Sequence, residues 1–187
     1  AGIAEKTGAK LGTLSPGANS AGLSLAGVLP KNGKGKHAGA MLDESLDAVV
    51  LLNLEPDADI YSTPDAVAKL AKQNYVVALT PFVSDALLEV ADLLLPIGTF
   101  AETSGTYVNV EGTPQSFGGV ANPVGEARPG WKVLRVLGNL VGAEGFDYVT
   151  SEDVLAEFNA KVAEVSAGSY VASGQVAKAN GADAPAD

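Results

Sequence analysis

The chain has 187 residues, of which 47% are hydrophobic and only 18% charged, so one ordinary domain with a sizeable core is expected. Its net charge of −10 disfavours nucleic-acid binding, because contacts to phosphates need clustered cations. With no cysteine and one histidine, the sequence excludes disulfides, thiolate metal sites and iron–sulfur ligation within these residues.

The longest aliphatic run, residues 48–52, is far too short for a membrane span, so no direct membrane insertion is expected. The chain opens on Ala1, its only methionine is Met41, and no signal peptide is recognisable. We interpret it as a fragment of a longer protein.

The N-terminal region is rich in residues that break regular structure. Residues 15–39 carry many Gly, Ser, Asn, Lys and Pro, which predicts loop with one short helix. Asn19 or Ser20 is expected to cap that helix, which would run to about Gly27.

Three short apolar runs follow, within residues 46–54, 75–79 and 92–96. They are continuous rather than alternating, which is typical of parallel strands buried on both faces. Between them, a helix is expected after Thr63 as cap and Pro64 at its first position, and a second from Ser84 to about Ala91. This order predicts an open parallel sheet with flanking helices, a Rossmann-like α/β fold.

The C-terminal half predicts an extended segment over residues 106–110 and two amphipathic helices. The first helix would begin at Pro129 and end at Gly142, and the second would begin at residues 150–153. From residue 166 the composition becomes small and polar. We therefore predict an α/β domain over residues 1–165 and a small-residue tail over residues 166–187.

Two local patterns have a plain interpretation. Residues 33–38 fit the Gly-x-Gly-x-x-Ala form of a dinucleotide fingerprint, but no strand precedes them, so a solvated loop is favoured over a ligand contact. His37 in that segment is expected to be an exposed loop residue, with proton transfer as the alternative.

Polar residues gather after two of the predicted strands. Asp57 and Asp59 follow the first strand, where a turn is favoured over magnesium or ribose binding. Residues 102–112 crowd carboxylates, an amide and hydroxyls together, which indicates either a buried polar network or a ligand wall. We predict that Asn109 and Glu102 or Glu111 accept hydrogen bonds from the backbone.

The chain resembles the molybdopterin oxidoreductase superfamily. The residues that carry this resemblance are 91–96, 100–102, 105–112 and Gln115. Segments 17–22, 51–57 and 123–134 make it similar to the large iron–sulfur subunits of bacterial NADH-quinone oxidoreductase, the respiratory complex I. The resemblance runs from about Leu11 to Gly142.

In that family cysteines of the N-terminal part hold iron–sulfur clusters, so the resemblance implies a C-terminal fragment with clusters elsewhere in the full subunit. Glu55 stands where molybdenum enzymes usually carry Asn, and Thr113 where relatives usually carry Arg. Both changes disfavour an anionic pterin dinucleotide. The implied pocket is vestigial, without catalytic residues or metal ligands, and its candidate residues are Asn53, Glu55, Asp57, Glu102, Thr106, Asn109 and Glu111.

The resemblance implies an accessory domain of a subunit that passes electrons from NADH to quinone. Its expected partners are the remainder of its own chain and other subunits of the hydrophilic arm, on the cytoplasmic side of the bacterial inner membrane. Two alternatives stay open: an active molybdopterin-binding domain of an oxidoreductase, and a free-standing nucleotide-binding module.

Overall fold

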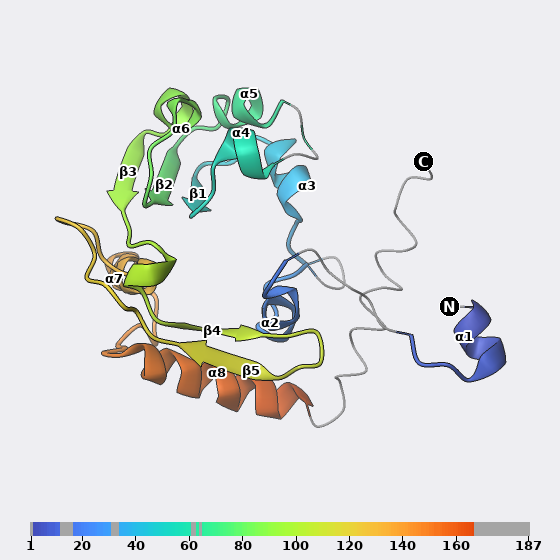
Figure 1. The fold of residues 1–187 in the computed structure, drawn as a ribbon. Helices are drawn as coiled ribbons and strands as arrows, with labels where there is room; N and C mark the ends of the chain where they lie inside the picture. The colour runs from blue at the N-terminus through green and yellow to red at the C-terminus, as the bar shows by residue number, and fades with distance from the viewer. Residues whose placement is uncertain (1, 12–16, 31–33, 61–62, 64, 167–187) are drawn as a thin grey trace. The chain divides into compact units, whose positions relative to one another are not determined.

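The computed structural model describes residues 2–11, 17–30, 34–60, 63 and 65–166. The chain divides into two compact units, which are considered separately (Figure 1). We call the first the sheet unit, formed by Pro30–Gly105 and Phe117–Ser151, and the second the hairpin unit, formed by Ala1–Leu29, Thr106–Ser116 and Glu152–Asp187. The predicted domain over residues 1–165 stays a prediction, and residues 167–187 of the predicted tail lie outside the described residues.

The sheet unit is built around three parallel strands in the order β1-β2-β3. Its elements are α3 (Ala38–Leu42), β1 (Val49–Leu52), α4 (Pro56–Asp59), α5 (Ala66–Leu70), β2 (Val76–Thr80), α6 (Asp85–Val90), β3 (Leu93–Pro96), the 3₁₀ helix η1 (Phe100–Glu102) and α7 (Gly130–Leu140). Successive strands lie side by side, and the helices predicted between them correspond to α5 and α6. The mixed α/β fold with an open parallel sheet is thereby confirmed. α4 was not predicted, since Asp57 and Asp59 were expected in a turn and lie in this short helix instead.

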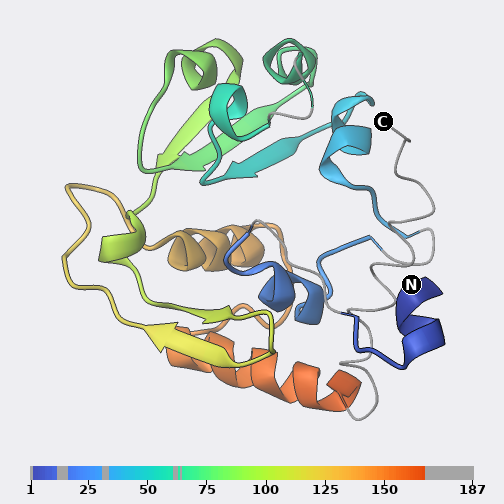
Figure 2. The same ribbon diagram turned by 45° about the vertical axis from the view of Figure 1, so that its right-hand side comes forward.

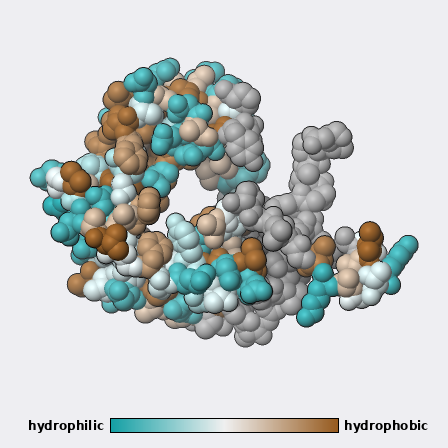
Figure 3. Space-filling view, in the orientation of Figure 1, coloured by the Kyte–Doolittle hydropathy of each residue, from teal (hydrophilic) through white to brown (hydrophobic). Residues whose placement is uncertain are grey.

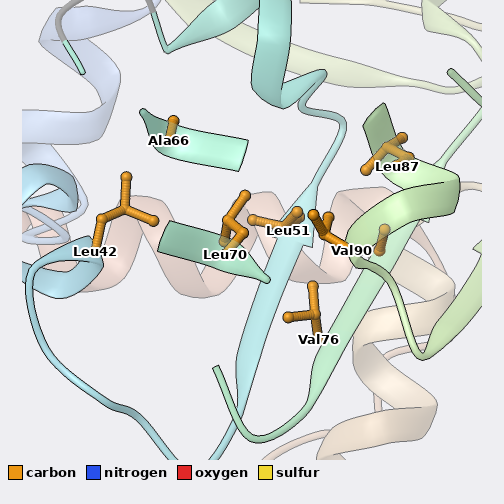
Figure 4. Close-up of a cluster of buried hydrophobic side chains, with 8 residues drawn as sticks. Leu42, Leu51, Ala66, Leu70, Val76, Leu87 and Val90 are labelled. Carbon is orange, nitrogen blue, oxygen red and sulfur yellow. The ribbon is translucent and has the colours of Figure 1, made fainter. Parts of the chain in front are cut away.

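The hydrophobic core lies between one face of the sheet and α3, α5 and α6 (Figure 4). Both views place α4, α5 and α6 on this same side of the strands (Figures 1 and 2). The core residues include Leu51 and Val76 from the strands and the fully buried Leu70 and Leu87 from the helices. Full burial of such a side chain contributes about 1.5–3 kcal/mol, so this one-sided layer stabilises the unit.

The opposite face of the sheet differs from the prediction. Val50 and Leu52 of β1 are 54% and 47% exposed, and Leu93 of β3 is 40% exposed. Only the central strand β2 is covered well on both faces, with Leu79 fully buried. The prediction that all three strands are buried on both faces is therefore wrong for the two outer strands, because every connecting helix packs on the other side.

Two helix starts can be compared with the sequence. Ser84 caps α6 as predicted, because its hydroxyl accepts a hydrogen bond from the backbone N–H of Leu87 at 3.2 Å. At α5 the N-cap position belongs to Asp65 and not to Thr63. The carbonyl oxygen of Thr63 accepts from the N–H of Ala66, while Pro64 lies outside the described residues.

A cluster of charges joins α5 to the residue after α3. The Lys69 ammonium donates to the carboxylate of Asp43 at 2.7 Å and pairs with that of Asp65 at 3.2 Å. These two carboxylates raise the pKa of Lys69 above its ordinary value of 10.5.

α3 lies partly within a segment that the sequence predicted as loop. Nδ1 of His37 accepts a hydrogen bond from the N–H of Ala40 at 3.2 Å and so caps this helix. His37 is exposed, as expected, but it stands at a helix start. α7 agrees with its prediction: Pro129 holds the N-cap position, and Gly142 follows the helix with φ +73°.

The hairpin unit contains α1 (Gly2–Thr7), α2 (Ser20–Leu25), the strands β4 (Gly105–Val108) and β5 (Pro114–Phe117), and α8 (Ser151–Ser166). Gly105, Phe117 and Ser151, at the ends of these elements, belong to the sheet unit. β4 and β5 form a two-stranded sheet, of which the sequence predicted only the first strand. α8 begins where its helix was expected.

Asn19 has a different role from the predicted helix cap. It occupies the N-cap position of α2, but its side chain makes no capping hydrogen bond. Its Oδ1 accepts from the backbone N–H of Val108 at 2.8 Å instead, which ties α2 to β4 within the hairpin unit. Val108 is buried, so this bond is part-buried as well.

None of the helices in the described part of the chain combines the length and the apolar character that crossing a membrane requires.

Candidate functional site

The candidate residues fall into both units. Asn53, Glu55, Asp57 and Glu102 belong to the sheet unit, where they follow the carboxyl ends of β1 and β3. Thr106, Asn109 and Glu111 belong to the hairpin unit. Each group is therefore considered within its own unit.

The turn after β1 uses its own polar groups. Asn53 has φ +49°, a left-handed conformation that Asn tolerates, and its N–H donates to the carbonyl of Leu79 at 2.8 Å. The N–H of Glu55 donates to a carboxylate oxygen of Asp59, also at 2.8 Å. Pro56, at the first position of α4, has no N–H to offer. This turn therefore presents few free donors.

The same turn concentrates negative charge. Glu55, Asp57 and Asp59 place three carboxylates within five residues, and Asp57 and Asp59 are exposed. Their repulsion disfavours a phosphate-bearing ligand at the end of β1. A helix N-terminus that attracts anions needs several free N–H groups, and here the Glu55 N–H is already bonded and Pro56 has none.

Glu102 forms a capping box at the end of β3. Its Oε2 accepts from the backbone N–H of Thr99 at 2.8 Å and from the Thr99 hydroxyl at 3.1 Å. The backbone N–H of Glu102 donates to the carbonyl of Thr99 at 3.0 Å. The prediction that at least one of the two glutamates accepts from the backbone is confirmed. The Thr-x-x-Glu spacing of Thr99 and Glu102 is the sequence pattern that indicates such a capping box.

Gly98 and Arg128 fix the backbone beside this capping box. A Cβ at Gly98 would lie 3.1 Å from Cβ of Glu102, so the backbone approaches closely there. The N–H of Gly98 donates to the carbonyl of Arg128 at 2.9 Å. The Arg128 guanidinium, which the sequence did not single out, donates to the carbonyl of Ala127 at 2.7 Å. This cation therefore organises its own loop.

Asn109 closes the turn between β4 and β5. Its Oδ1 accepts from the N–H of Thr113 at 2.8 Å and from that of Glu111 at 3.0 Å. The backbone adds hydrogen bonds from Asn109 N–H to the Thr113 carbonyl and from Gly112 N–H to the Asn109 carbonyl. Gly112 has φ +86°, which side chains rarely adopt. The predicted bond from Asn109 to the backbone is confirmed.

The other two hairpin candidates differ in their contacts. The hydroxyl of Thr106 lies 2.9 Å from that of Ser116, across the strand pair. Glu111 is exposed, and its N–H donates to Asn109. The side chains of Asn109 and Thr106 thus bond within the hairpin, at its turn and across the strand pair.

The donor set can be compared with the groups that the resemblance implies. An anionic pterin dinucleotide does not fit the end of β1, where carboxylates gather and the Glu55 N–H is already bonded. Iron–sulfur ligation does not fit a sequence without cysteine. Across the described ranges, no group of three or more His, Asp and Glu side chains is arranged to hold a metal ion.

Comparison with known proteins addresses the family directly. No curated protein matches the chain. The sequence does match the profile of the molybdopterin oxidoreductase family over residues 2–140. This span includes the whole parallel sheet and α7, and the mixed α/β fold agrees with it. The chain belongs to the molybdopterin oxidoreductase family.

Proposed function

We propose that this chain is an accessory domain of the large iron–sulfur subunit of NADH:quinone oxidoreductase and makes no bonds itself. The subunit passes electrons from NADH to quinone through iron–sulfur clusters that lie outside these residues. Family membership supports the oxidoreductase context. The absence of cysteine from the sequence is consistent with clusters held elsewhere.

One observation carries the proposal: the end of β1 is unsuited to the anionic cofactor of the family. Asp59 occupies the N–H of Glu55, Pro56 removes the next donor, and the side chains there are acidic. In the parallel-sheet folds that bind nucleotides, this edge is where the ligand lies. We therefore infer that this chain has kept the parallel sheet of the family but lacks the free N–H donors that would bind an anionic cofactor at this edge.

The proposed partners are the remainder of the same chain and other subunits of the hydrophilic arm. The location would be peripheral, on the cytoplasmic side of the bacterial inner membrane. Exposed apolar side chains support the proposal that other protein surfaces pack against this chain. Phe82, Val83 and Leu88 are between 55% and 62% exposed, and Phe100 is 83% exposed. In the space-filling view, hydrophobic residues reach the surface over α6 and β3 (Figure 3).

The test uses the purified chain. After dialysis we expect no stoichiometric molybdenum or iron by elemental analysis, and no oxidation of NADH with ferricyanide as acceptor. Guanosine diphosphate, a probe for the dinucleotide end of the cofactor, should give no calorimetric binding signal. Bound molybdenum or tight binding of the nucleotide would favour an active cofactor-binding domain instead.

A second experiment tests the assignment to this subunit. The chain is co-expressed with the cluster-bearing part of its own gene product and with the hydrophilic-arm subunits of the source organism. We expect it to co-purify with them in a stoichiometric complex. A reading frame that starts directly before Ala1, with no cysteine-rich part upstream, would indicate a free-standing module and overturn the assignment.

A further inference from the structure

The second face of the parallel sheet is apolar, and its outer strands β1 and β3 are partly uncovered while Leu79 at its centre is fully buried. By the strand register, Val50, Val77 and Leu93 are neighbours on this face. Leu52, Leu79 and Leu95 form the next row. We call these six residues the open face. None carries a charge, and three of them are at least 40% exposed.

The first residue of α7 lies at the carboxyl end of the open face. A Cβ at Gly130, its first residue, would lie 3.6 Å from Cδ1 of Leu52 and from Cδ1 of Ile97. Leu52 nevertheless remains 47% exposed, and Val50, further from that end, is 54% exposed. Parallel sheets are normally covered by helices on both faces, whereas here the outer strands β1 and β3 keep exposed apolar side chains on this face.

We propose that the open face is the docking site of one amphipathic helix from a partner protein. Its apolar stripe would pack on Val50, Val77 and Leu93 with aliphatic side chains. Its end over the amino edge of the strands would carry Lys or Arg. This inference rests on the sheet alone and holds whether or not the proposed function does.

Two carboxylates at the amino ends of the strands indicate which charge the partner helix should carry there. Asp47 precedes β1 and Asp92 precedes β3, and both are exposed. Asp92 accepts a hydrogen bond from the N–H of Val76 at 2.7 Å, which fixes its carboxylate at this edge. Neither aspartate has an ion-pair partner among the residues that the structure describes. Together with the acidic turn at the carboxyl end of β1, these two carboxylates make the surroundings of the apolar face complementary to an apolar helix that carries basic groups at its ends.

A second copy of the chain fits this surface less well. Stable interfaces bury about 800 Å² on each partner, whereas the open face offers three substantially exposed side chains. One helix, which needs only a narrow apolar strip, matches the size of the face.

The experiment uses three synthetic helical peptides of equal length as probes, with the full chain as receptor. The first has a leucine stripe at helical spacing and lysines at one end. The second replaces those lysines with glutamates, and the third has the composition of the first with its stripe scrambled. Affinity is measured by fluorescence anisotropy, and protection of β1 and β3 by amide hydrogen exchange.

We expect the lysine-ended peptide to bind and to protect β1 and β3. Val50→Asp should weaken this binding by about tenfold or more, because it places a charge in an apolar contact. Val50→Thr, which keeps the branched shape, serves as a milder variant. Val120→Asp is the matched control, since Val120 is 89% exposed in a loop outside the open face. Circular dichroism checks that each variant is folded.

Four results would overturn the proposal. The lysine-ended peptide could fail to bind, or could bind the Val50→Asp and Val120→Asp variants equally. The scrambled or glutamate-ended peptide could bind as tightly as the first. Self-association of the chain that Val50→Asp abolishes would identify a second copy as the occupant instead.

Discussion

Asn109→Ala should loosen the turn between β4 and β5. The change deletes the Oδ1 that accepts from Glu111 and Thr113 at 3.0 and 2.8 Å. Each such bond contributes about 0.5–1.5 kcal/mol net, and both lie at the surface, where water can replace the lost acceptor. We therefore expect a loss of about 1–2 kcal/mol. For a chain of this size, that corresponds to about 2–8 °C in Tm.

Thermal unfolding followed by circular dichroism measures this loss, and amide hydrogen exchange locates it. Exchange should accelerate at the N–H groups of Glu111 and Thr113. Asn109→Asp is the matched control, because its carboxylate keeps an acceptor at the same position and should retain most of the stability. An unchanged Tm in Asn109→Ala together with lost binding of guanosine diphosphate would identify a ligand site and refute the reasoning.

Three further predictions concern the sheet unit. Leu70→Ala, at a fully buried position, should cost about 2–5 kcal/mol in urea unfolding; a cost below 1 kcal/mol would contradict the assigned core. Lys69→Met should lower Tm at pH 7, and less so at high salt. Because its folded pKa is raised, the stabilisation by Lys69 should be present below pH 10.5 and be lost as pH rises through the folded pKa; a flat profile there would oppose this. Gly138→Ala should destabilise α7, since the new Cβ would lie 2.2 Å from the ring of Phe146, and the added change Phe146→Ala should relieve the clash.

The parallel sheet could be predicted because its signals are local. Short continuous apolar runs separated by helix-start residues are enough to predict β1, β2 and β3 and their order. Ser84 could be predicted as a cap for the same reason, since its partner is only three residues away. Local signals of this kind were sufficient for the sheet and for α6, although the equally local cap of α3 by His37 was missed.

Several other errors arise where residues distant in the sequence determine the structure. The exposure of Val50 and Leu93 depends on which side the connecting helices pack, and no apolar run encodes that choice. Asn19 bonds to Val108, 89 positions away, although its local context favours a helix cap. β5 consists of exposed residues without apolar alternation, and it is a strand because β4 pairs with it.

The candidate site residues also make mainly local hydrogen bonds. Glu102 bonds to Thr99, three residues away, Asn109 to residues two and four away, and Asp59 to Glu55, four away. Such bonds form within one turn and need no ligand to be satisfied. Ligand sites in parallel-sheet proteins combine groups from several strand ends, left free until the ligand arrives. The polar residues that resembled a ligand wall are therefore hydrogen-bonded within their own turns. The part of the sheet that lacks a packing partner is the exposed part of its apolar open face.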